Sequence, residues 1–177
     1  MHITLPFTYT IIKQLECGDR VKVSGVMYTA RDAAHKRMTE MLDEGKPLPF
    51  DPKGQTIYYA GPCPAKPGHV IGSCGPTTSG RMDAYAPRLL DLGLKAMIGK
   101  GQRSPEVIES MVKNGCVYLG AIGGAGALYS KCITEVEVIA YEDLGPESVK
   151  RLVVKEMPLT VIIDCHGNNL YDKANQQ

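Results

Sequence analysis

The hydrophobic and polar positions of the chain follow two different periods. In the segment 19–26, polar residues alternate with valine and small residues, which is typical of a strand with one buried face. Between residues 33 and 42, apolar residues recur at helical spacing instead. We therefore expect a helix that is capped by Thr29 and ends near Gly45 and Pro47.

Strands and helices then alternate up to residue 131. We expect strands at 56–60, 69–73, 94–98 and 116–121, and helices at 82–92, at 104–113 and from 123 or 124 to 131. Pro87 either interrupts the helix at 82–92 or marks its true first turn, and Gly93 suits its C-cap. This alternation predicts parallel βαβ units.

The last part of the chain has a different pattern. Strands are expected at 136–141, 151–155 and 160–164, joined by short segments, which favours a second, more antiparallel layer. No linker is long enough to divide the 177 residues, and this length fits one domain, 1–177. The pattern predicts an α/β fold with one mostly parallel sheet and a smaller antiparallel layer.

Composition excludes several classes of function. Twenty Lys and Arg residues against nineteen Asp and Glu residues leave a net charge of +1, too little to attract nucleic acid or an anionic membrane. No apolar run approaches the ~20 residues that cross a bilayer, and the start of the chain lacks a secretory signal pattern, so we expect a cytoplasmic protein. The six cysteines form no CxxC pair and no metal-binding spacing, which predicts reduced thiols and no metal bound by this chain alone.

Three short segments carry polar or cationic residues just beyond expected strands: 29–31, 75–81 and 99–101. Open α/β sheets bind ligands at that edge. In the loop 75–81 (GPTTSGR), Thr77 and Thr78 offer hydroxyl groups, and Arg81 follows Thr77 by one helical turn. A capped turn with a solvated Arg81 explains this loop about as well. It is neither a Walker A motif nor GxGxxG, so a nucleotide site is poorly supported.

Other candidates in the sequence are less specific. Arg31 falls in the first turn of an expected helix, where backbone N–H groups favour an anion. Lys100 lies between two glycines at the end of an expected strand. The glycine-rich run 123–128 could hold a carboxylate or could serve close helix–sheet packing. We assign no role to His35 or His166.

Four ordered motifs together carry a family resemblance. They are TARDAAH at 29–35, GPTTSGRMD at 75–83, IGKG at 98–101 and the run 123–128. They closely resemble the β subunit, or C-terminal domain, of class I iron–sulfur fumarases and L-tartrate dehydratases, over nearly the whole chain. The resemblance implies a swivelling β/β/α fold of three layers.

The resemblance also implies a function for individual residues. A partner α subunit would hold a 4Fe-4S cluster with one open iron, and the active site would form where α and β meet in a heterotetramer. Arg31, Thr77, Arg81 and Lys100 match the family's substrate contacts, and Thr78 joins them as a candidate. The expected reaction is the reversible dehydration of (S)-malate to fumarate, with Thr77 at the proton-transfer position and Lys100 activating it.

Three alternatives stay open at this point. L-tartrate differs from malate by one hydroxyl group, and no residue here decides between the two substrates. The chain could instead be a stand-alone anion-binding or regulatory module without catalytic activity. A phosphate-binding transferase would use GPTTSGR as its anion site and would bind phosphoesters without a partner.

Overall fold

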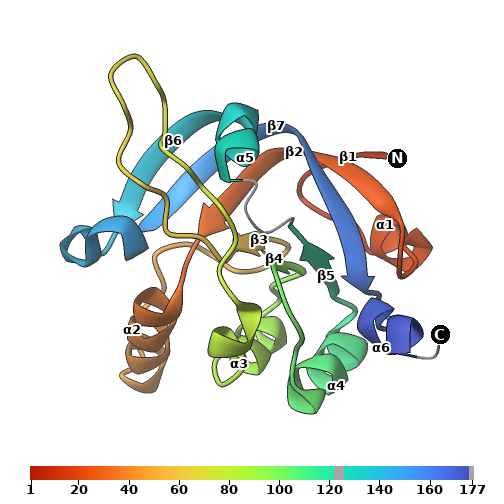
Figure 1. Ribbon diagram of the computed structural model, residues 1–177. Helices are drawn as coiled ribbons and strands as arrows, with labels where there is room; N and C mark the ends of the chain where they lie inside the picture. The colour runs from red at the N-terminus through yellow and green to blue at the C-terminus, as the bar shows by residue number, and fades with distance from the viewer. Residues whose placement is uncertain (122–125, 176–177) are drawn as a thin grey trace.

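The strands of this protein form one sheet that closes on itself. The computed structural model describes residues 1–121 and 126–175, and its seven described strands follow the order β1-β2-β3-β4-β5-β7-β6. Because β2 also pairs with β7, the strands β2, β3, β4, β5 and β7 form a closed, barrel-like ring (Figure 1). The strands are β1 (His2–Thr4), β2 (Arg20–Thr29), β3 (Thr56–Tyr58), β4 (Ala96–Gly99), β5 (Val117–Gly120), β6 (Ile133–Ala140) and β7 (Val149–Ile163).

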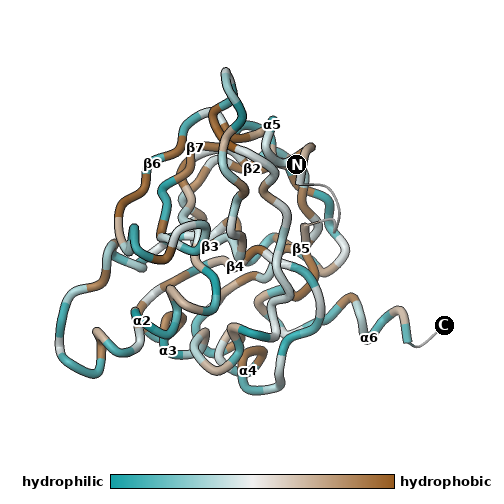
Figure 2. The backbone as a smooth tube through the Cα atoms, turned by 60° about the vertical axis from the view of Figure 1, so that its left-hand side comes forward, coloured by the Kyte–Doolittle hydropathy of each residue, from teal (hydrophilic) through white to brown (hydrophobic). Residues whose placement is uncertain are grey.

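Helices lie on both sides of this ring. In Figures 1 and 2, α2, α3 and α4 lie together on one side and α5 lies on the opposite side. The helices are α1 (Tyr9–Gln14), α2 (Asp32–Asp43), α3 (Ala86–Asp91), α4 (Pro105–Asn114), α5 (Gly126–Cys132) and α6 (Leu170–Asn175), with 3₁₀ turns η1 (Ser79–Met82) and η2 (Glu142–Glu147).

The expected parallel and antiparallel regions both exist, but they share a sheet. β2 through β5 pair in parallel, whereas β7 runs antiparallel to β2, β5 and β6. The mixed α/β prediction is confirmed, and the division into three layers is not. The strands expected at 151–155 and 160–164 are one strand, β7, with Glu156 at a φ of 51° where its register against β2 shifts.

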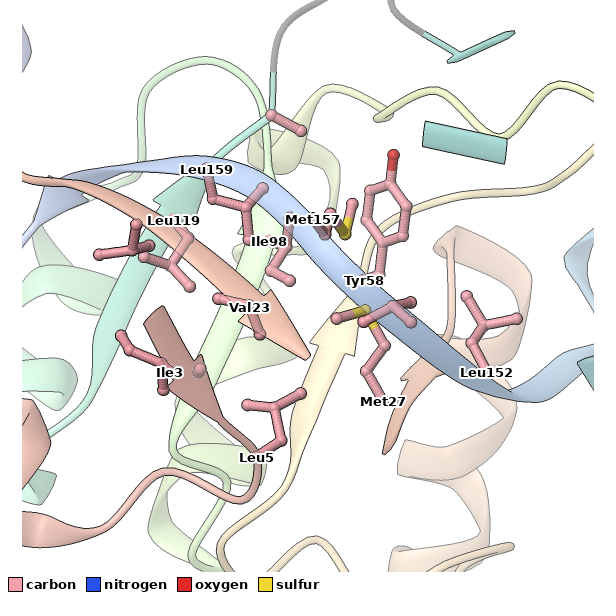
Figure 3. Close-up of a cluster of buried hydrophobic side chains, with 14 of the residues drawn as sticks. Ile3, Leu5, Val23, Met27, Tyr58, Ile98, Leu119, Leu152, Met157 and Leu159 are labelled. Atoms are coloured by element: carbon pink, nitrogen blue, oxygen red, sulfur yellow. The ribbon is translucent and has the colours of Figure 1, made fainter. Parts of the chain in front are cut away.

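Both faces of the central strands are buried, which explains their short apolar runs. Inside the ring, Tyr58 and Ile98 pack with side chains from β1, β2, β5 and β7 (Figure 3). On the outer face, Ile57, Tyr59 and Met97 pack against α2, α3 and α4. Successive residues of β3 thus point into different cores, as the two-residue period of a strand requires.

Several local expectations are confirmed and others are wrong. The helix expected at 104–113 forms as α4, which Ser104 caps by accepting a hydrogen bond from the Val107 N–H, and Pro87 lies in the first turn of α3. Thr29 does not cap α2. Its hydroxyl accepts a 3.3 Å bond from the Lys150 N–H at the β2–β7 pairing, and the N-cap is Arg31 in extended conformation.

No strand forms at 69–73, although the sequence predicts one. This segment returns along a long loop that projects from the ring on the same side as α5 (Figures 1 and 2). The loop is closed by bonds from the Cys63 N–H to the Ser73 carbonyl and from the Gly72 N–H to the Cys63 carbonyl. Within 69–73, these bonds occupy the Gly72 N–H and the Ser73 carbonyl, two of the groups that a strand would use for pairing. The elements β1, α1 and α6 were not expected from the sequence.

Candidate functional site

The three candidate segments meet at one edge of the sheet. β2, β3 and β4 are parallel neighbours, so their carboxyl ends lie side by side. The loop 75–81 does not follow a strand, but two hydrogen bonds attach it there. The Thr77 N–H donates to the Tyr59 carbonyl at 2.7 Å, and the Ser79 N–H donates to the Lys100 carbonyl at 2.8 Å. Thr78 and Lys100 consequently form an isolated parallel bridge.

The two candidate arginines converge on a single carboxylate. Arg31 Nε lies 3.7 Å from Asp32 Oδ1, and Arg81 Nη1 lies 4.0 Å from Asp32 Oδ2. Both separations exceed a hydrogen bond, and the buried Arg31 Nε and Asp32 Oδ1 have no hydrogen-bond partner among the described residues. Asp32 offsets the repulsion between two guanidinium groups at this edge. Sequence reasoning missed Asp32, although it stands in the TARDAAH motif beside Arg31.

A second carboxylate reaches the same place from η2. Glu147 Oε1 accepts a 3.3 Å bond from the Ala33 N–H in the first turn of α2 and lies 3.9 Å from Arg31 Nε. The Glu147 carboxylate therefore lies close to both the N-terminus of α2 and the Arg31 side chain. Glu147 is 114 residues from Ala33, and nothing in the local sequence identifies it.

His35 is a structural residue of this edge. It is 1% exposed, and its Nδ1 donates to the Arg31 carbonyl at 2.8 Å. Its buried Nε2 has no hydrogen-bond partner in the part of the chain that the structure describes. Burial lowers the pKa of His35 to about 4, despite the opposing effect of that hydrogen bond. His35 is therefore neutral at pH 7 and fixes the backbone of Arg31.

The glycines around Lys100 have packing roles. A Cβ atom on Gly99 would overlap with Ser79 Oγ and would lie 2.9 Å from a ring carbon of Tyr59. Gly101 has a φ of 86°, which side chains rarely tolerate. The two glycines let the 75–81 loop lie directly on the end of β4, and the exposed Lys100 side chain projects from that junction.

A buried arginine lies beneath both loops. The Arg103 side chain is 0% exposed, and its Nε donates to Asp83 Oδ1 at 2.7 Å. The other oxygen of Asp83 accepts a 2.7 Å bond from the Ser104 N–H. Burial lowers the pKa of Arg103, but Tyr59 and Asp83 outweigh that effect and raise its pKa, so the guanidinium stays charged. The pair connects η1 with the turn after Lys100, a long-range contact that no sequence motif identifies.

The glycine-rich candidate at 123–128 lies partly outside the described residues, which omit 122–125. At its described end, a Cβ atom on Gly126 would overlap with Ser73 Oγ, and the Gly126 carbonyl accepts a bond from the Cys74 N–H. Close backbone packing accounts for Gly126.

Neither a metal site nor a membrane span is found in the described ranges. Among residues 1–121 and 126–175, no three His, Cys, Asp or Glu side chains come together as metal ligands do. Within the same ranges, each helix is too short or too polar to cross a bilayer.

The comparison with known families decides the identification. The model of the family described as Fumarase C-terminus matches residues 1–174. This chain belongs to the fumarase C-terminus family. The fumarase C-terminus domain is 40% identical over 165 residues to fumarate hydratase 2 of Leishmania major, covering 92% of this chain and 29% of that protein. It is 38% identical over 169 residues to the anaerobic class I fumarate hydratase of Escherichia coli K12, covering 94% and 31%.

One relative has a similar length. The fumarase C-terminus domain is 39% identical over 172 residues to a Methanocaldococcus jannaschii protein assigned as the β subunit of an L(+)-tartrate dehydratase, covering 94% of this chain and 88% of that protein. By contrast, the chain spans less than a third of the two fumarate hydratases. Membership of the fumarase C-terminus family and the similarity to a separate β subunit are therefore established.

Proposed function

We propose that this chain is the β subunit of an iron–sulfur hydro-lyase that converts (S)-malate to fumarate reversibly. The convergence of Arg31 and Arg81 on one edge, beside the Thr77 loop and Lys100, carries the proposal. The family relationship supports a dehydratase, and the named activity of the full-length relatives supports malate and fumarate.

The substrate would be bound by its two carboxylates. Arg31 and Arg81 present planar guanidinium groups that suit carboxylates, and Lys100 would add a point charge once it has accepted a proton. Thr78, next to Thr77 and exposed at the same junction, would contribute a hydroxyl contact. Loss of the C–H proton places extra negative charge on the adjacent carboxylate, so these cations would stabilise the transition state more than the bound substrate.

Proton transfer is proposed for Thr77 with Lys100. A threonine hydroxyl is a weak base unless a neighbour takes its proton, so a neutral Lys100 would accept that proton while Thr77 takes the C–H proton of malate. A 4Fe-4S cluster held by a partner α subunit would act as the Lewis acid for the departing hydroxyl. In this proposal α and β subunits pair into a heterotetramer, and this chain contributes no cluster ligand.

A dehydratase acting on L-tartrate is the second candidate. The observation that favours it is the match to a separate β subunit over 88% of that protein's length. The binding groups proposed here would serve either dicarboxylate, because both substrates present two carboxylates and a hydroxyl group to be removed.

Reconstitution of the two-chain enzyme tests the proposal. The chain is co-produced with its candidate α subunit, loaded anaerobically with iron and sulfide, and assayed with malate and with tartrate. Arg31→Met and Arg81→Met should each raise KM about 10- to 100-fold, since each removes a charged hydrogen-bonding group. Thr77→Ala should lower kcat with little change in KM. Arg88→Met, which removes an exposed arginine paired with Asp43, is the matched control.

The outcome separates the candidates. If kcat/KM is higher with tartrate than with malate, tartrate rather than malate is the substrate. Near wild-type turnover of Thr77→Ala would remove Thr77 from proton transfer. Activity of this chain alone, or iron bound to it stoichiometrically, would refute the half-site proposal.

A further inference from the structure

A buried tyrosine hydroxyl joins the two loops that carry the proposed site. Tyr118, on β5, is fully buried, and its Oη lies 2.7 Å from Ser79 Oγ and 2.8 Å from the Gly101 carbonyl oxygen. The hydroxyl has a single proton, and a carbonyl can only accept. Tyr118 therefore donates to Gly101, and Ser79 donates to Tyr118.

The two partners of this hydroxyl lie among the candidate site residues. Ser79 stands between Thr77 and Arg81, and Gly101 directly follows Lys100. One oxygen atom therefore joins the loop with the proposed proton-transfer residue to the turn with the proposed activating lysine. The Ser79 N–H bond to the Lys100 carbonyl also links these segments, so Ser79 is held by both its side chain and its backbone. Farther along both segments, the Arg103–Asp83 pair joins them as well.

The tyrosine ring is held independently of its hydroxyl. The Arg103 guanidinium lies 4.9 Å from the Tyr118 ring centroid, and Arg103 is itself bonded to Asp83 and Tyr59. Burial raises the pKa of Tyr118, although the Ser79 bond and Arg103 act against it, so the hydroxyl keeps its proton at neutral pH. Removing only the oxygen atom should leave the ring in place and release the two loops.

We propose that Tyr118 is a positioning residue of the dehydratase site, whose hydroxyl holds the Thr77–Arg81 loop and the Lys100 turn at the spacing that proton transfer requires. The inference rests on the proposed function, because Thr77 and Lys100 are the groups that it positions. Tyr118 itself is buried and is assigned no contact with substrate. Its effect should therefore appear mainly in kcat, through Thr77 and Lys100, with a smaller rise in KM through Arg81.

The first test needs no activity. Tyr118→Phe should increase amide hydrogen exchange at least about 10-fold in peptides covering 77–81 and 100–102, measured on the isolated chain by mass spectrometry. Tyr129→Phe is the matched control, because it removes another buried tyrosine hydroxyl, one that donates to the Pro158 carbonyl. Unchanged exchange in both loops of Tyr118→Phe would overturn the proposal, even if the reconstituted enzyme proved inactive.

The second test uses the reconstituted enzyme. Tyr118→Phe should lower kcat about 10- to 100-fold with KM changed less than about threefold, since misplacement of reacting groups by about 1 Å has effects of that size. In a Lys100→Ala background the same change should have almost no further effect on kcat. Equal fold losses in the two backgrounds would show that Tyr118 does not act through Lys100.

A second variant covers the case in which Tyr118→Phe does not fold. Ser79→Ala removes the donor of the same network and leaves the Tyr118 bond to Gly101. It should lower kcat in the same way and increase exchange in 77–81. Wild-type kcat and exchange in Ser79→Ala would overturn the proposal. An inactive wild-type complex with the predicted exchange changes would refute the dehydratase function while retaining the structural link.

Discussion

Replacement of Arg103 by methionine tests how the site is supported. The Arg103 side chain is fully buried, and it pairs with Asp83, whose side chain is 16% exposed. Methionine fills a similar length of the cavity but offers no donor. The variant leaves the half-buried Asp83 Oδ1 without its arginine partner, while Asp83 Oδ2 keeps its bond from the Ser104 N–H.

The structure gives the size of this effect. Removing one partner of a buried, hydrogen-bonded ion pair costs about 3–5 kcal/mol, because the remaining charge stays desolvated. For a chain of this length, 1 kcal/mol corresponds to roughly 2–4 °C in Tm, so we expect a loss of about 6–20 °C. In the double variant with Asp83→Asn, the unpaired charge is gone, and we expect recovery to within about 1–2 kcal/mol of wild type.

The assay is reversible urea unfolding with thermal melts as a second probe. Arg88→Met is the matched control, because Arg88 makes a 2.7 Å ion pair with Asp43 at the surface and should lose less than about 1 kcal/mol. Equal losses of unfolding free energy in Arg103→Met and Arg88→Met would refute the reasoning. Failure of the double variant to recover stability would show that packing, rather than the unpaired charge, sets the cost.

Three further predictions concern pH, packing and thiol reactivity. Burial lowers the pKa of His35 to about 4 in the folded chain, against an ordinary 6.5. The unfolded chain therefore takes up a proton first as pH falls, and the free energy of unfolding should decrease by about 3 kcal/mol between pH 6.5 and pH 4. His35→Phe should flatten that part of the stability profile, and an unchanged slope would contradict the assignment. Gly99→Ala should lower the free energy of unfolding, measured with denaturant, by about 1–3 kcal/mol through overpacking. Gly80→Ala, where a methyl group has room, should leave it almost unchanged. Equal losses in the two variants would contradict the packing argument. Burial raises the pKa of Cys74 to about 12, so iodoacetamide at pH 8 should label the exposed Cys63 first, and mass spectrometry showing the reverse order would exclude the described burial.

Local patterns predicted much of the secondary structure. Valine-rich alternation located most of β2, and helical spacing located α2, because each pattern reflects a face that must be buried. The helix expected at 104–113 forms as α4, since helical spacing reflects a face that must be buried. The prediction of a strand at 69–73 was wrong, because local sequence does not distinguish a strand from a loop that is closed by its own backbone hydrogen bonds.

The candidate site shows the same division. Arg31, Thr77, Arg81 and Lys100 could be chosen from the sequence because each stands in a short recognisable motif. Their predicted roles stay predictions until the reconstituted enzyme is assayed. Asp32 belongs to one of those motifs but could be assigned only when its carboxylate was seen beside both arginines.

What the sequence determined by itself is the family, the kinds of chemical group at the site and most of the local elements, since all of these depend on residues close together along the chain. Only the tertiary structure decided that β7 closes the sheet into a ring, and that Glu147, Arg103 and Tyr118 support the candidate residues. Those contacts join segments far apart in the sequence. Their geometry follows from packing and hydrogen bonding across the whole fold, which no local pattern encodes.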